Sequence, residues 1–145
     1  MDKKELNTDA ALAQWQTCVE MANSISQRRD VMNNLFVTLN LAIIAAITLV
    51  FDIKTIFIIV AGIVMCVIWM LFIHNFKLLN QEKFNIINEM EQHLPFQPFA
   101  KEWESLKSNK KYSEETKLEK VLPIVFIILY IAAGVVIIIT KILEV

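Results

Sequence analysis

Three long apolar runs dominate the pattern of hydrophobic and polar positions along the chain. No charged residue occurs from Val31 to Phe51, and the stretch 35–51 is almost wholly apolar. A second uncharged apolar run covers 56–73, and a third covers 121–140. A helix rises about 1.5 Å per residue, so runs of about 17 residues or more reach across most of a bilayer's hydrocarbon core. The sequence therefore predicts an all-α, polytopic membrane protein with three transmembrane helices.

Two charged segments, 8–34 and 74–120, continue helical patterns beyond these runs. The first carries apolar residues at steps of three or four, with Arg29 in the same stripe: Leu12, Trp15, Val19, Ala22, Ile25, Met32 and Phe36. The second carries a narrower stripe: Phe76, Leu79, Lys83, Ile86 or Ile87, Met90 and Leu94. Such stripes are typical of amphipathic helices. We therefore predict a single membrane domain, 1–145, in which two spans extend into a cytoplasmic helical bundle.

A proline-containing break interrupts the second charged segment. Pro95 and Pro98 each disfavour α geometry in the residue before them, so the helix should stop there. Four large apolar side chains lie in or after the break: Phe96, Phe99, Trp103 and Leu106. Because this is too much apolar surface to leave in water, we expect these side chains to pack against the two stripes, near Trp15.

The distribution of positive charge predicts the orientation of the spans. Twelve of the fourteen lysines and arginines lie in residues 1–34 and 74–120. Short segments rich in these residues remain in the cytoplasm. We therefore expect both segments to be cytoplasmic and the C-terminus to lie outside.

Composition and charge exclude several classes of protein. The chain of 145 residues is 56% hydrophobic with a mean hydropathy of +0.50, well above an ordinary soluble domain. Its net charge of −1 offers no broad basic surface for phosphates, so we expect no nucleic-acid partner. Cys18 stands in a polar segment and Cys66 in an apolar one, so no disulfide is expected.

The sequence predicts no catalytic or cofactor site. No phosphate loop, nucleophile elbow or HExxH motif occurs. Glu82, Glu89, Glu91 and His93 hold carboxylates and an imidazole, but the interval from Glu89 to His93 does not match the Glu-x-x-His pairs of carboxylate-bridged metal sites. We expect a solvated helix face there, with no metal, no cofactor and no enzymatic activity.

Polar and small residues within the spans indicate how the helices pack. Asn33 and Asn40 are seven residues apart and share a helix face. An unpaired amide in hydrocarbon is costly, so Asn40 should bond to another helix or line a wet cavity, and we favour the first. Gly62 and Gly134 stand among other small residues that permit close approach of two backbones, within or between subunits.

The pair Arg28 and Arg29 lies just before the first span, and two interpretations remain open. The arginines anchor the helix at the headgroups and fix its topology, which we favour. In the alternative, Arg29 forms a buried ion pair with a carboxylate such as Glu89 or Glu91.

Residues distributed over most of the chain, from about Trp15 to Tyr130, resemble the RipA family of octameric bacterial membrane proteins. The resemblance rests on Trp69, Asn80, Lys83, Glu91, Pro95 and Trp103, on Arg28 and Arg29 with Asn33, and on the stretch from Lys117 to Tyr130. It implies a bacterial inner-membrane location, an eightfold homo-oligomer and no established biochemical activity.

Two functions are compatible with these observations. The first is an oligomeric membrane scaffold, and the alternative is an oligomeric channel or pore-forming effector lined by Asn40 or the alanine faces. The partners expected are the lipid bilayer and other copies of the chain. The candidates for packing or assembly are Arg28, Arg29, Asn33, Asn40, Gly62, Trp69, Asn80, Lys83, Glu91, Pro95, Trp103 and Gly134.

Overall fold

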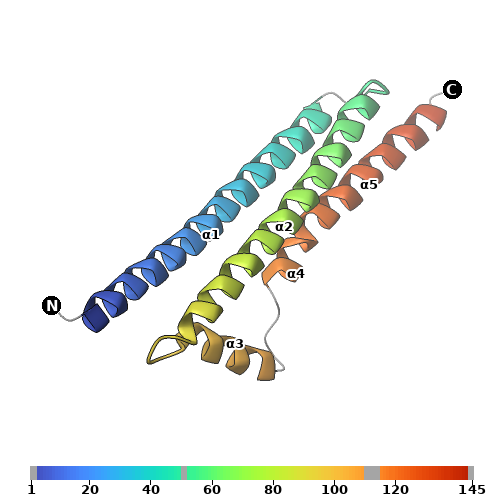
Figure 1. The fold of residues 1–145 in the computed structure, drawn as a ribbon. Coiled ribbons are helices and arrows are strands. Elements are labelled where there is room, and N and C mark those ends of the chain that lie inside the picture. The colour runs from blue at the N-terminus through green and yellow to red at the C-terminus, as the bar shows by residue number, and fades with distance from the viewer. Residues whose placement is uncertain (1–2, 50–51, 110–114, 144–145) are drawn as a thin grey trace. The chain divides into compact units, whose positions relative to one another are not determined.

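The structure, a computed structural model, describes residues 3–49, 52–109 and 115–143. Within these ranges, the side chains of residues 3–7 and 115–116 are not described. Its helices, in chain order, are α1 (Lys3–Leu49), α2 (Thr55–Glu91), α3 (Pro98–Ser108), α4 (Glu115–Glu119) and α5 (Val121–Leu143) (Figure 1). Of the described residues, 91% are helical and none lies in a strand, which confirms the all-α prediction. Positions 50–51 of the predicted first span and 110–114 of the predicted cytoplasmic segment lie outside the described residues.

Within the part of the chain that the structure describes, three helices are long and apolar enough to cross a membrane. They are Thr8–Leu49, Thr55–Glu91 and Lys117–Leu143. Because a span needs only about 20 residues, α1 with 47 residues and α2 with 37 extend well past their apolar runs, as the two amphipathic stripes predict. The multi-pass membrane protein expected from the sequence is therefore confirmed.

Local chemistry determines where the helices end. Between α1 and α2, the backbone N–H of Thr55 donates to the carbonyl of Asp52 at 2.9 Å, and the Asp52 carboxylate accepts from the N–H of Ile53 at 2.7 Å. α2 ends at Glu91 and α3 begins at Pro98, so the helix breaks around Pro95 as expected.

The chain divides into two compact units. The peripheral unit contains residues 1–29 and 76–113, and the membrane unit contains residues 30–75 and 114–145. α1 and α2 each contribute one part to both units, α3 belongs to the peripheral unit, and α5 belongs to the membrane unit.

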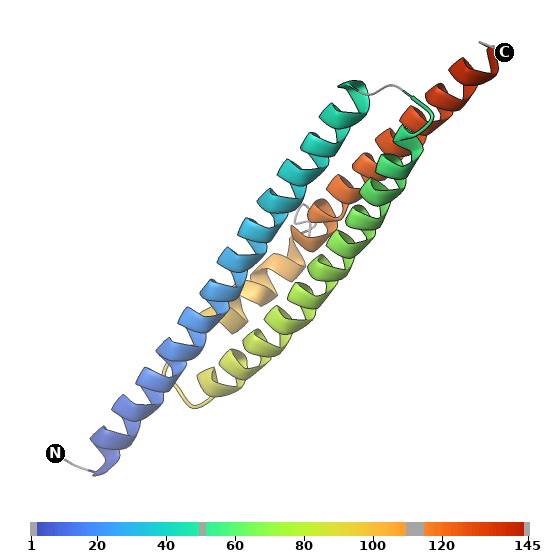
Figure 2. The ribbon, with the colours of Figure 1, turned by 90° about the horizontal axis from the view of Figure 1, so that it is seen from above.

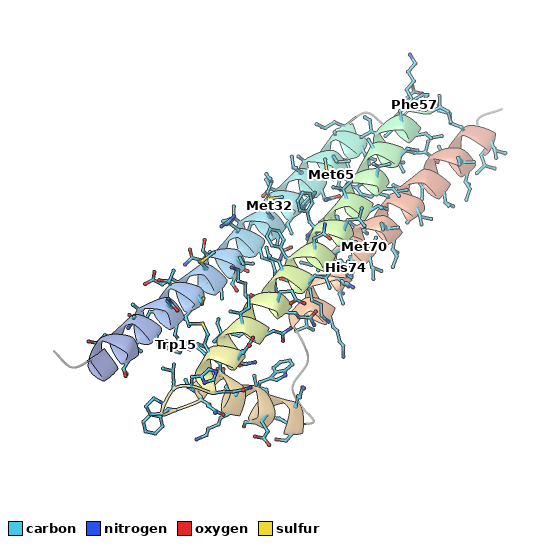
Figure 3. All side chains as sticks on the ribbon, viewed as in Figure 1. Trp15, Met32, Phe57, Met65, Met70 and His74 are labelled. Carbon is cyan, nitrogen blue, oxygen red and sulfur yellow. The ribbon has the colours of Figure 1, made fainter. Side chains whose placement is uncertain are left out.

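In the membrane unit, α1, α2 and α5 lie side by side (Figures 1 and 2). Their inward residues form one buried cluster: Phe36, Ile47, Ile59, Cys66, Trp69, Ile73, Phe126, Tyr130 and Ile137. Most of the outward residues are apolar as well, and among them Ile128 is 59% and Val136 52% exposed. At the start of α2, Phe57 is among the most exposed aromatic side chains (Figure 3). An apolar outer face of this kind suits a lipid environment.

In the peripheral unit, the first part of α1 and the last part of α2 pack together with α3. The buried residues include Ala22 and Ile25 of α1 and Ile87 of α2. The stripe predicted on α2 is wrong at Leu79, which is exposed, and of the two alternatives Ile86 and Ile87 it is Ile87 that is buried. Ile86 and Ile87 are equally apolar, so their sequence pattern does not determine which of them faces inward.

Candidate functional site

Asn40 is the centre of a polar cluster that joins the three helices of the membrane unit. Its side chain on α1 is fully buried. The Asn40 Oδ1 accepts hydrogen bonds from the Tyr130 hydroxyl of α5 at 2.8 Å and from the Cys66 thiol of α2 at 3.2 Å. The Asn40 Nδ2 donates to the carbonyl of Phe36, one turn earlier, at 2.8 Å. Both polar atoms of the amide are therefore bonded within one subunit.

Gly62 on α2 makes room for the tyrosine of this cluster. A Cβ built on Gly62 would lie 2.5 Å from Cζ of Tyr130, closer than real Cβ contacts come. A Cβ on Gly134 would instead meet only Cδ1 of Ile59, at an ordinary 3.7 Å. Glycine is therefore required at position 62, because any side chain there would clash with the Tyr130 ring. At position 134 an alanine would fit without a clash.

A second polar cluster, centred on Asn33, connects helices of the same unit. The Trp69 indole N–H of α2 donates to Asn33 Oδ1 at 2.8 Å, and Asn33 Nδ2 donates to Glu119 Oε1 of α4 at 2.7 Å. The Trp69 ring stacks on Phe36, with centroids 5.6 Å apart and planes 8° from parallel. Asn33 and Asn40, which share a face in the sequence, thus each connect α1 to two other helices.

Glu91 has a structural partner that its sequence position does not indicate. Its carboxylate is fully buried in the peripheral unit and accepts the backbone N–H groups of Phe99 and Ala100, each at 3.2 Å. These amides belong to the first turn of α3, and Gln97 before it provides no side-chain cap. A carboxylate at a helix N-terminus satisfies unpaired donors and interacts favourably with the helix dipole. Glu91 of α2 therefore caps α3.

The aromatic residues after the proline break behave in two different ways. Phe99 packs as expected, with its ring centroid 6.0 Å from Trp15 and 5.7 Å from Phe84 (Trp15 is labelled in Figure 3). The expectation of burial is wrong for Phe96, which is 78% exposed, and for Trp103, which is 42% exposed. Phe96 lies in the turn before α3, and Trp103 lies one turn beyond Phe99, so the contact of Phe99 with Trp15 and Phe84 does not cover them.

The remaining candidates take varied positions. Arg28 is exposed and its guanidinium lies 3.5 Å from the Ser24 hydroxyl one turn earlier, whereas Arg29 is buried. Lys83 Nζ lies 4.0 Å from the sulfur of Met21 on α1. Asn80 is half-buried and Pro95 is exposed in the turn after α2. The assembly roles of all these residues remain predictions, as does the Arg29 ion pair.

The sequence analysis did not identify three hydrogen-bond partners of Asn33 and Asn40, namely Cys66, Tyr130 and Glu119. A tyrosine hydroxyl inside an apolar span needs an acceptor, which was the available signal for Tyr130. Glu119 is half-buried, but it follows a polar segment, and the residue types beside it indicate no partner for its carboxylate. Among the described residues, no group of three or more His, Cys, Asp or Glu side chains gathers in a metal-binding arrangement.

Comparison with known proteins identifies the family. The profile of the octameric membrane protein family matches residues 12–140, which is most of the chain. The chain belongs to the octameric membrane protein family. The matched segment contains both polar clusters, the proline break, all of the second helix able to span a membrane and most of the first and third. Searches of curated proteins and of solved structures returned no match. Membership of this family makes the chain an oligomeric membrane protein.

Proposed function

We propose that this family member is a non-enzymatic scaffold of the bacterial inner membrane, built as a ring of eight identical subunits. The observation that supports a scaffold over a channel is the state of Asn40. A pore lined by Asn40 needs its amide to face water, but the Oδ1 accepts from Tyr130 and Cys66 and the Nδ2 donates to Phe36. The polar groups between the spans thus hold each subunit together.

The number eight rests on the family, and the oligomer agrees with the chemistry of the surface. The apolar side chains on the outer faces of α1, α2 and α5 suit lipid or a neighbouring span equally well, because lipid is as apolar as leucine. The peripheral unit also exposes large apolar side chains, Phe96 and Trp103 among them. Single exposed apolar residues are common, but an aromatic pair on one short segment favours protein contact.

Counting subunits tests the assembly and a flux assay tests the scaffold. Native mass spectrometry and electron microscopy of the detergent-purified protein should give eight copies. Liposomes that contain the purified ring should hold a sodium or potassium gradient as well as empty liposomes do. A steady ion flux that scales with the amount of protein would instead favour the channel.

The same proposal places the N-terminus and residues 74–120 in the cytoplasm, on the strength of the charge distribution. Lys54, in the turn between α1 and α2, and Lys101, in α3, are both exposed and suit cysteine labelling. In intact cells, a membrane-impermeant maleimide should react with the variant Lys54→Cys and not with Lys101→Cys. Reaction of Lys101→Cys and not of Lys54→Cys would mean that the protein has the opposite orientation in the membrane.

A further inference from the structure

The three spans of the membrane unit differ in the side chains that they expose. In α2 between residues 56 and 73, and in α5 between residues 121 and 139, every exposed side chain is apolar, and most are large. The exposed residues of α1 between 35 and 49 include two threonines and two alanines beside four leucines. Of the three helices able to span a membrane in the described part of the chain, α1 is also the least hydrophobic. The outward surface of α1 is therefore the least suited to lipid.

Small and polar residues share one side of α1, here named the α1 face and formed by Asn34, Thr38, Ala42 and Ala45. They follow one another at intervals of four, four and three residues, which is the spacing of one helix face. All of them are exposed in the subunit. The opposite side of the helix carries the buried residues Phe36, Asn40 and Ile47. Because Asn40 bonds to α2 and α5, the α1 face points away from both of these helices.

The two polar side chains of the α1 face retain the capacity to form hydrogen bonds. The Thr38 hydroxyl donates to the carbonyl of Asn34, one turn earlier, at 2.9 Å, and its oxygen can still accept a further bond. The Asn34 amide, at the start of the apolar stretch, makes no side-chain hydrogen bond within the residues that the structure describes. Lipid tails offer no donor or acceptor to either group, whereas another helix does.

The small side chains of the α1 face permit close contact with a second helix. Thr38 and Ala42 are four residues apart, which is the small-x-x-x-small spacing of closely packed membrane helices. Large aliphatic side chains gain little by leaving lipid, because lipid tails are equally apolar. Contact between helices in a bilayer therefore favours surfaces where backbones approach closely and polar groups find partners. The α1 face meets both conditions, and the outward faces of α2 and α5 meet them less well.

Other copies of the chain are the source of such a helix, because the chain belongs to an octameric family. We propose that the α1 face packs against the next copy in the ring, whereas lipid covers most of the outward surface of α2 and α5. Contacts in a ring of more than two copies are heterologous, so the neighbour meets the α1 face with a different part of its own surface. This inference rests on the ring proposed above.

Leucine substitutions at exposed alanines test this assignment. Ala42→Leu and Ala45→Leu place a large side chain on the α1 face, and the controls Ala61→Leu and Ala132→Leu place the same side chain on the outward faces of α2 and α5. All four alanines are exposed, so each subunit should keep its fold, and leucine also favours membrane insertion. Native mass spectrometry of the full-length variants in mild detergent counts the subunits. Both α1 variants should reduce the share of the eight-copy ring roughly tenfold, and both controls should retain it.

Ala45→Ser keeps the side chain small and should keep the ring, which separates the effect of size from the loss of alanine. An intact ring in both α1 leucine variants would mean that the α1 face meets lipid or a water-filled centre, and it overturns the inference while the ring stands. Equal dissociation of the two control variants overturns it as well. So does a dissociated Ala45→Leu subunit that unfolds more readily than the parent subunit, because Ala45 would then belong to the subunit core. A monomeric parent protein overturns the ring and the inference together.

Discussion

The membrane unit and the peripheral unit differ in where their polar and apolar side chains lie and in what those side chains contact. In the membrane unit, the amides of Asn33 and Asn40 bond to other helices of the same subunit, and apolar side chains cover most of the outside. In the peripheral unit, a buried carboxylate, Glu91, caps α3, while Phe96 and Trp103 are exposed. No residue of α3 is fully buried.

The environment explains this difference. In hydrocarbon an unpaired polar group is costly and an apolar surface costs nothing, so internal polar bonds complete a single membrane unit. In water the costs are reversed, because exposed apolar area is unfavourable and polar groups are solvated. We infer that the subunit fold is determined mainly between the spans, and that the peripheral unit supplies further surfaces for assembly. Four substitutions test this division, in order of decreasing effect.

The largest effect is expected from Gly62→Ala. The new Cβ would lie 2.5 Å from Cζ of Tyr130, so the buried ring must move and its hydrogen bonds to Asn40 weaken. Overpacking of this kind costs about 3 kcal/mol of unfolding free energy. Denaturation of the subunit in mixed detergent micelles measures the change. Gly134→Ala, whose Cβ meets an ordinary 3.7 Å contact, is the matched control and should be nearly neutral. Equal losses for the two variants would contradict the tyrosine pocket.

Asn40→Leu should come next, at about 2 kcal/mol. It removes the acceptor of the Cys66 thiol and the 2.8 Å acceptor of the Tyr130 hydroxyl, which keeps only its longer 3.3 Å bond to the backbone carbonyl of residue 40. The same denaturation assay applies. Thr48→Val is the control, since Thr48 is exposed and bonds only to the carbonyl of Ala45 in its own helix. A stable Asn40→Leu subunit that no longer forms the ring would mean that Asn40 acts between subunits.

Glu91→Ala should lower the stability of α3 by about 1–2 kcal/mol, because two backbone donors of its first turn lose their acceptor. Hydrogen exchange at the amides of Phe99 and Ala100 should accelerate roughly tenfold, since about 1.4 kcal/mol is a factor of ten. Glu89→Ala, on the exposed side of α2, is the control. Unchanged exchange in Glu91→Ala would mean that the cap contributes nothing to α3.

The smallest effect on the subunit is expected from Trp103→Ala. Trp103 is 42% exposed, so its removal should change the unfolding free energy of the dissociated subunit by less than about 0.5 kcal/mol. The ring should nevertheless dissociate at lower detergent concentration than the parent, as native mass spectrometry will show. A loss above about 2 kcal/mol in the dissociated subunit would place Trp103 in the core of the peripheral unit instead.

Much of the fold follows from the sequence because its causes are local. Each apolar run has enough consecutive residues to cross most of the hydrocarbon core as a helix. The predicted break around Pro95 agrees with the end of α2 at Glu91. The α1 stripe is confirmed at Ala22, Ile25 and Phe36, which are buried, and is wrong at its first residue, Leu12, which is 43% exposed. These features depend on the spacing of residues within a single helix.

The partners of the polar residues depend on how helices are rotated against each other, and only the tertiary structure decided them. The sequence indicates that Asn40 needs a partner in hydrocarbon, but Tyr130 lies 90 residues away and becomes available only when α5 packs beside α1. In the same way, Ile87 is buried and Ile86 is exposed, although the two residues are identical in type and adjacent. Successive residues of an α-helix point about 100° apart, so only one of the two can face inward. Contacts with the other helices determine which one, because they fix the orientation of α2 about its own axis.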